Sequence, residues 1–150
     1  MLKGSPIPTK LCRPPVPSGC IDRPLLLRRL TAGLEAGRMA TIVSAPAGFG
    51  KSTCICQWID SLAYLPSAWL SLEPPDNDPA IFFGSLLAAL HKVDENLGRD
   101  LNGMLMAGEI PPSETLCGVL AADILALNRP FVLVLDDLHN IQDPLINKTL

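Results

Sequence analysis

The stretch that decides the fold class of this chain is Ala45-Pro46-Ala47-Gly48-Phe49-Gly50-Lys51-Ser52. Before it lies a short apolar run, residues 39–43, whose β-branched character predicts a buried strand. After it lies a segment that predicts a helix from Lys51 to about Ala63. A small-residue loop between a strand and a helix is the arrangement in which a helix N-terminus binds phosphate.

The same stretch nearly fits the phosphate-loop pattern GxxxxGK[ST], with Ala45 in place of the first glycine. Gly48 and Gly50 permit the backbone angles that turn successive N–H groups inward. Lys51 can reach the β- and γ-phosphates, and Ser52 can bind Mg²⁺. The alternative is a glycine-containing loop with a surface lysine. We predict that a bound nucleotide contacts eight residues: Ala45, Ala47, Gly48, Phe49, Gly50, Lys51, Ser52 and Thr53.

A second segment carries two adjacent carboxylates. The unbroken apolar run from residue 131 to 135 predicts a parallel strand that is covered on both faces, and Asp136 and Asp137 follow it directly. Ligands of open α/β sheets bind at the carboxyl ends of the strands. Asp136 can therefore hold the metal, while Asp137, acting with Lys51, is the candidate catalytic residue that orients or deprotonates water. The alternative is a pair of solvated residues that end a strand.

Helices and strands alternate along the rest of the chain. Residues 1–20 hold five of the fifteen prolines and predict an extended N-terminal arm, so the folded domain is expected over residues 21–150. Asp22, Asp78, Ser113 and Asp143 are expected to cap helices. The alternation predicts an α/β fold with a mostly parallel sheet flanked by helices. The predicted elements are helices near 24–34, 51–63, 79–93, 101–106, 113–127 and 144–150, with strands near 39–43, 67–72 and 131–135.

Composition excludes several classes of function. The net charge is −3 and no cluster of Lys or Arg exceeds a pair, so the chain lacks the electrostatic footprint of a nucleic-acid binder. The five cysteines are odd in number and have no CxxC spacing, which indicates free thiols rather than disulfides or a zinc site. No apolar segment has membrane-spanning length and no signal peptide is visible. A cytoplasmic protein without membrane contact is expected.

Four segments, in order along the chain, resemble the large ATP-dependent LuxR-type (MalT-like) transcription regulators. The longest is the phosphate loop with its flanks, from Thr41 to Thr53. The others are Thr9-Lys10-Leu11 leading to Asp22-Arg23-Pro24, then Trp69 to Glu73 with Asp76 to Pro79 and Phe82, and finally Pro130 to His139. The resemblance spans nearly the whole chain and is more specific than the two phosphate-site motifs alone.

This resemblance implies a P-loop NTPase domain of the STAND class, related to AAA ATPases. It implies ATP or ADP and Mg²⁺ as cofactors, and Arg23 as a further residue near the nucleotide. The implied regulator self-associates when the full-length protein binds ATP, and binds DNA only through a C-terminal domain that these 150 residues do not contain. Three strands are few for such a sheet, so we expect an incomplete domain here, with later strands and the lid missing. The central strand of such folds would then follow Leu150.

Three functions remain open at this point. The first is a switch that binds ATP and hydrolyses it slowly, with weak ATPase activity in the complete protein only. The second is a conventional ATPase or kinase, although the cationic candidates between the motifs, among them His91, Lys92 and Arg99, are few. The third is an inactive fragment of the regulator.

Overall fold

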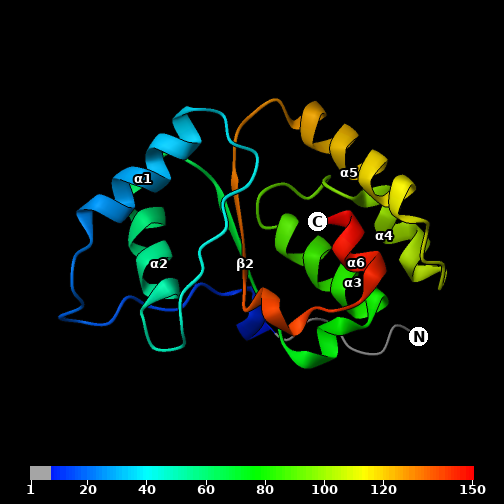
Figure 1. The fold of residues 1–150 in the computed structure, drawn as a ribbon. Coiled ribbons are helices and arrows are strands. Elements are labelled where there is room, and N and C mark those ends of the chain that lie inside the picture. Colours follow the sequence, from blue (N-terminus) through cyan, green and yellow to red (C-terminus); the bar gives the residue numbers. More distant parts are fainter. Residues whose placement is uncertain (1–7) are drawn as a thin grey trace. The chain divides into compact units, whose positions relative to one another are not determined.

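The computed structural model describes residues 8–150, which belong to two compact units. The loop unit, residues 13–64, contains α1 (Pro24–Glu35) and α2 (Lys51–Ser61). The sheet unit, residues 1–12 and 65–150, contains both strands and the remaining helices (Figure 1). Along the described part of the chain, no helix combines the length and the apolar character needed to cross a bilayer.

The sheet is parallel, as the sequence predicts. β1 (Ser67–Ser71) pairs with β2 (Val132–Asp136), in a register that runs from Ser67 opposite Val132 to Ser71 opposite Asp136. The connection between the two strands carries helices, because parallel neighbours need a long crossover. The predicted strands at 67–72 and 131–135 are therefore confirmed to within a residue at each end.

Helices pack against this sheet to form the core of the sheet unit. α3 (Pro79–Leu90) contacts β1, α4 (Arg99–Met106) and α6 (Pro144–Thr149), and α5 (Ser113–Leu127) contacts α4 and α6. Asp78 and Asp143 cap α3 and α6 as predicted, since each carboxylate accepts hydrogen bonds from two N–H groups of the first turn. The largest fully buried apolar side chains are Phe82, Phe83, Leu70, Leu72, Leu87, Leu101, Leu116 and Ile146.

One predicted strand is absent. Residues 39–43 have no regular secondary structure, and Met39 and Ile42 are 100% and 86% exposed. A strand forms only where a neighbour satisfies its N–H and C=O groups, and the sheet of the described residues consists of β1 and β2 alone. The β-branched pattern at 39–43 is a preference for a pleated surface, which cannot form a ladder without a partner strand.

The N-terminal arm and two helix caps also differ from the predictions. Residues 8–11 of the arm form a 3-10 helix, η1 (Pro8–Leu11), while residues 1–7 lie outside the described part. Arg23, not Asp22, is the N-cap residue of α1, because the Asp22 carboxylate accepts a hydrogen bond from Gln57 instead. Pro112 takes the cap position of α5, which leaves Ser113 as its first residue.

A buried ion pair fastens η1 to the turn after β1. The Lys10 ammonium, 7% exposed, donates to the fully buried carboxylate of Asp76. Asp76 also accepts from the Glu73 backbone N–H at 2.7 Å and from the Ser85 hydroxyl at 3.3 Å. A run of prolines and polar residues such as Pro74-Pro75-Asp76-Asn77 predicts only a turn at this position. The structure shows instead that this carboxylate joins three segments of the sheet unit.

We expect Asp76→Ala to lower the free energy of unfolding of the sheet unit by about 3–5 kcal/mol, because the buried Lys10 ammonium loses its counter-ion. The matched control is Asp78→Ala in the same turn, which removes an exposed cap and should cost about 1 kcal/mol. Urea unfolding followed through Trp69 measures both. Equal losses for the two variants would show that the Lys10–Asp76 pair has no special weight.

Candidate functional site

The loop before α2 has the backbone shape that its glycines permit. Gly48 has φ +81°, and Gly50 has φ +71° and is the N-cap residue of α2. No side chain caps this helix, so the N–H groups of its first turn have no side-chain acceptor. The predicted loop-to-helix transition at Lys51 is confirmed, whereas the strand predicted before the loop is not formed.

Lys51 contacts two carbonyl groups of its own loop. Its ammonium donates to the carbonyl oxygens of Ala45 at 2.8 Å and Pro46 at 3.3 Å, so the side chain folds back over its own loop. That Lys51 reaches the phosphates of a bound nucleotide stays a prediction. An ammonium needs acceptors, and the loop carbonyls are the nearest ones.

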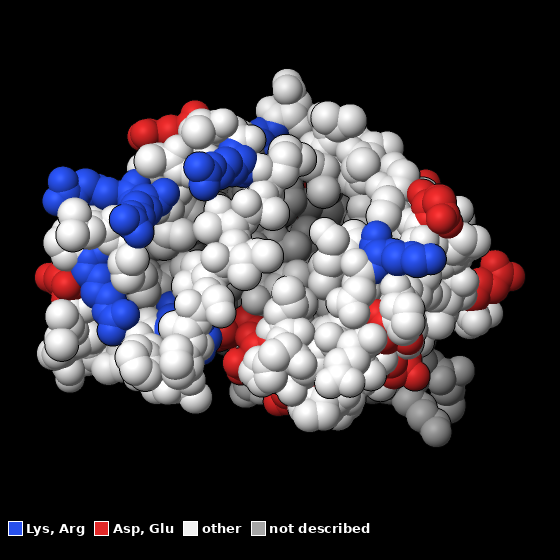
Figure 2. All heavy atoms as spheres, viewed as in Figure 1, with Lys and Arg blue, Asp and Glu red and all other residues white. Residues whose placement is uncertain are grey.

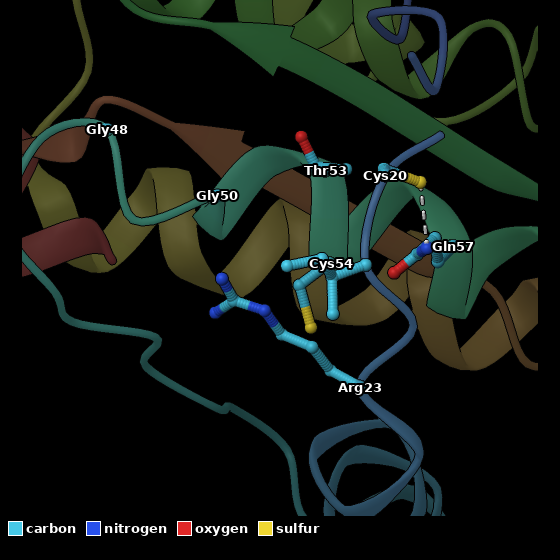
Figure 3. Close-up of a pocket in the computed structure, with 8 residues that line it drawn as sticks. Cys20, Arg23, Gly48, Gly50, Thr53, Cys54 and Gln57 are labelled. Carbon is cyan, nitrogen blue, oxygen red and sulfur yellow. Dashed lines mark hydrogen bonds between the residues drawn. The ribbon is translucent and has the colours of Figure 1, made fainter. Parts of the chain in front are cut away.

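A cavity of about 160 Å³ lies beside the loop, wholly within the loop unit. The α2 side of it is formed by Gly50, Thr53, Cys54 and Gln57, which follow the spacing i, i+3, i+4, i+7 and so share one face of the helix. Figure 3 shows these residues with the chain segment of Cys20 to Arg23 on the other side. The full lining is Cys20, Ile21, Arg23, Gly48, Gly50, Thr53, Cys54 and Gln57.

The predicted loop residues meet this cavity only in part. Gly48, Gly50 and Thr53 line it, and so does Arg23, whose guanidinium would lie 3.5 Å from a Cβ added to Gly50. Figure 3 shows the Arg23 side chain reaching toward the loop. The remaining candidates, Ala45, Ala47, Phe49, Lys51 and Ser52, are not among its lining residues.

Sequence reasoning missed Cys20, Ile21, Cys54 and Gln57 as lining residues. A signal for two of them was present, because positions 53, 54 and 57 continue the helix face that starts at Gly50. Nothing in the sequence indicates that residues 20 and 21 lie opposite that face. Their position depends on contacts such as the hydrogen bond from Gln57 Nε2 to Cys20 Sγ at 3.1 Å.

The two carboxylates lie at the carboxyl end of β2, in the sheet unit, as predicted. Asp136 is half-buried, and its carboxylate accepts from the N–H of Asp137 at 3.1 Å. Asp137 is exposed and has φ +57°, a left-handed conformation uncommon outside glycine. Its Oδ1 lies 3.8 Å from Nδ1 of His139. Two neighbouring carboxylates of different exposure are thus held at this strand end.

Charge is distributed unevenly between the two units. The loop unit contains six Lys and Arg residues against three Asp and Glu, whereas the sheet unit contains six against twelve. Figure 2 shows basic side chains gathered over α1, where Arg28 and Arg29 are exposed. The unit that holds the glycine loop therefore has a net positive charge within an acidic chain, which favours an anionic ligand there.

Fold and site together define an α/β chain with a glycine loop at the start of a helix and a carboxylate pair at the end of a parallel strand. Comparison with known proteins then places it. The chain is 34% identical over 144 residues to the HTH-type transcriptional regulator MalT of Cronobacter sakazakii. It is 33% identical over 144 residues to the MalT proteins of two Klebsiella pneumoniae strains.

These matches cover 96% of this chain and 16% of each relative. The chain is therefore homologous to one segment of the MalT-type transcriptional regulators, which confirms the predicted resemblance. The chain spans about one sixth of the length of these curated relatives. No protein-family model matches it.

We expect Gly50→Ala to destabilise the loop unit by about 1 kcal/mol, because alanine is strained at positive φ. The control is Gly118→Ala in the middle of α5, where an added Cβ meets no atom within 4 Å. That change should stabilise the sheet unit by about 0.5–1 kcal/mol, since alanine is the better helix former. Trp58 reports unfolding of the loop unit and Trp69 that of the sheet unit. Changes of the same sign would contradict the assigned backbone conformation.

Proposed function

We propose that this chain is an ATP-binding switch domain of P-loop NTPase type in a MalT-like transcription regulator, and that it hydrolyses ATP slowly. One observation carries the proposal. Gly50, at φ +71°, begins α2 without any side-chain cap, directly before Lys51 and Ser52. An uncapped helix N-terminus after a left-handed glycine presents free N–H groups and the positive end of the helix dipole, and phosphate oxygens satisfy both.

The charge of the loop unit supports the same ligand. Its net positive charge attracts a polyanion, and Arg23 adds a guanidinium beside Gly50. In this proposal the Lys51 ammonium exchanges the carbonyl oxygens of Ala45 and Pro46 for phosphate oxygens when a nucleotide binds. The exchange is favourable because a charged acceptor makes the stronger hydrogen bond. Backbone N–H groups of Ala47 to Thr53 complete the phosphate site in this proposal.

We propose that Mg²⁺ is bound together with the nucleotide. Ser52, in the first turn of α2, and Asp136 offer hard oxygen ligands of the kind that Mg²⁺ prefers. When bound, the ion neutralises charge on the phosphates. Asp137 is exposed and sits at the carboxyl end of β2, so its carboxylate is free to orient or deprotonate a water molecule. Asp137 and Lys51 are the catalytic residues that we assign.

A switch fits this chain better than an enzyme that turns over a second substrate. Few cationic side chains lie between the two motifs, and two of them contact other side chains: Arg99 donates to Asn96 at 2.6 Å and Arg129 to Asp94 at 3.1 Å. The MalT relatives are named as transcriptional regulators. We therefore propose that ATP binding changes the assembly of the complete protein. In this proposal DNA is contacted by other parts of that protein, in the reducing cytoplasm.

We expect Lys51→Ala to weaken MgATP binding at least a hundredfold, because a charge-assisted contact to the phosphates is lost. Lys92→Ala is the matched control, since it removes an exposed lysine outside the site and should leave the Kd unchanged. Titration calorimetry of the purified protein with ATP and with ADP measures both variants. Equal Kd values for wild type and Lys51→Ala would refute the proposed phosphate site.

We expect Asp137→Ala to retain ATP binding and to slow hydrolysis by about 10²- to 10⁴-fold, because the carboxylate acts on water rather than on the nucleotide. A phosphate-release assay measures the rate, which for the wild type should lie well below the roughly 1–100 s⁻¹ of kinases. The control is Asp143→Ala, which removes the side-chain cap of α6 and so changes an acidic residue outside the site. A wild-type rate within the kinase range would favour an enzyme over a switch.

A further inference from the structure

The carboxamide of Gln57 has one half paired and one half unpaired. Its nitrogen donates to the Asp22 carboxylate at 3.2 Å and to Cys20 Sγ at 3.1 Å. Its oxygen is enclosed by protein and has no hydrogen-bond partner among the described residues. Figure 3 shows the nitrogen turned to Cys20 and the oxygen turned to the opposite side, toward Cys54. A buried acceptor without a donor is destabilising. Because Gln57 lines the cavity, its unpaired oxygen is an acceptor that a ligand donor could satisfy.

Asp22 fixes which half of the Gln57 carboxamide is left unpaired. An ionised carboxylate only accepts hydrogen bonds, so the NH₂ half of Gln57 must turn toward it. Rotating the amide by half a turn would set the Gln57 oxygen against the carboxylate oxygen. The half that is left unpaired is therefore an acceptor and cannot donate.

The spacing along α2 suits a nucleotide. Gln57 lies six residues beyond Lys51, about 9 Å along the helix axis. It shares one helix face with Gly50, where the phosphates are proposed to bind, and the cavity follows that face. A nucleotide whose phosphates contact the start of α2 can extend along this face, so that its base approaches Gln57.

We propose that Gln57 reads the base of the bound nucleotide: its Oε1 accepts a hydrogen bond from the 6-amino group of a purine. Asp22 is the positioning residue: it binds the NH₂ group of Gln57, so that only the acceptor oxygen is available to the base. Adenine presents an amino donor at position 6, whereas guanine and hypoxanthine present an oxygen there, which would face Oε1 acceptor to acceptor. This inference rests on the proposed nucleotide function and adds selectivity for 6-amino over 6-oxo purines. The enclosed oxygen is reached by a side-chain shift in the cavity wall, a common accompaniment of binding.

The test compares ATP with ITP, two nucleotides that differ in the 6-amino and 6-oxo groups. We expect wild-type protein to bind ATP at least tenfold more tightly than ITP. A tenfold ratio of Kd values is about the difference between a hydrogen bond made to Oε1 by ATP and an Oε1 left unpaired by ITP. Gln57→Leu keeps the size of the side chain and removes the amide. It should bring the Kd values for ATP and ITP within about twofold of each other, chiefly by weakening the binding of ATP.

Asp22→Asn is the second variant. The introduced amide can donate to Gln57 Oε1, which frees the Gln57 NH₂ to face the cavity and accept a 6-oxo base. ITP should therefore gain affinity relative to ATP. The matched control is Gln142→Leu, an exposed glutamine in the sheet unit, which should leave the ratio unchanged. Circular dichroism establishes that each variant is folded.

The outcomes separate this inference from the proposed function. If wild type binds ATP and ITP equally, or if Gln57→Leu and Asp22→Asn both keep the wild-type ratio, the base-reading role of Gln57 is wrong while nucleotide binding stands. If wild-type protein binds neither nucleotide, the proposed function itself fails. If Gln57→Leu lowers the ratio of ATP affinity to ITP affinity, and Asp22→Asn raises the affinity for ITP, the results support both the base-reading role of Gln57 and the proposed nucleotide binding.

Discussion

The loop unit depends on one constraint, the need of the first N–H groups of α2 for acceptors. Helices commonly meet this need with a Ser, Thr, Asp or Asn cap, yet Gly50 provides no side chain. The left-handed backbone of Gly48 and Gly50 bends the chain away from the helix axis and leaves the N–H groups open. A helix start without a side-chain cap is the arrangement that the proposed phosphate site requires. Within the loop, the Ala45 carbonyl accepts a hydrogen bond from the Lys51 ammonium.

The charged side chains before α1 make contacts that a helix-capping pattern does not predict. Asp22 is a good helix cap by residue type, and Pro24 suits the first turn. The structure instead sends the Asp22 carboxylate to the α2 side chain of Gln57 and the Arg23 guanidinium toward Gly50. Two consecutive residues therefore contact the two ends of one helix face. This arrangement links the N-terminal segment to the cavity and leaves α1 without a side-chain cap.

How much the sequence predicts depends on whether an element is defined locally. Helix starts at Pro79 and Pro144 are local, since an Asp-Pro pair supplies both cap and first turn, and both were predicted correctly. The end of α1 is local too, because Gly37 adopts φ +70° as a helix stop. Strand 39–43 is not local. Its apolar residues resemble those of β2, but β2 has β1 as a parallel neighbour and residues 39–43 have no neighbour in the described sheet.

The buried carboxylate of Asp76 is a second feature that the local sequence does not predict, because its ion pair joins distant residues. The string of prolines and acidic residues after β1 predicts a turn, and a turn does form there, as η2 (Pro74–Asn77). What the string cannot show is that a lysine sixty-six positions earlier enters the turn and is buried with it. A buried ammonium is tolerated only beside a carboxylate, and a buried carboxylate only where further donors satisfy it. Glu73 N–H and the Ser85 hydroxyl supply those donors, so the burial of Lys10 of η1 depends on polar groups of a turn and of α3 that lie far along the chain.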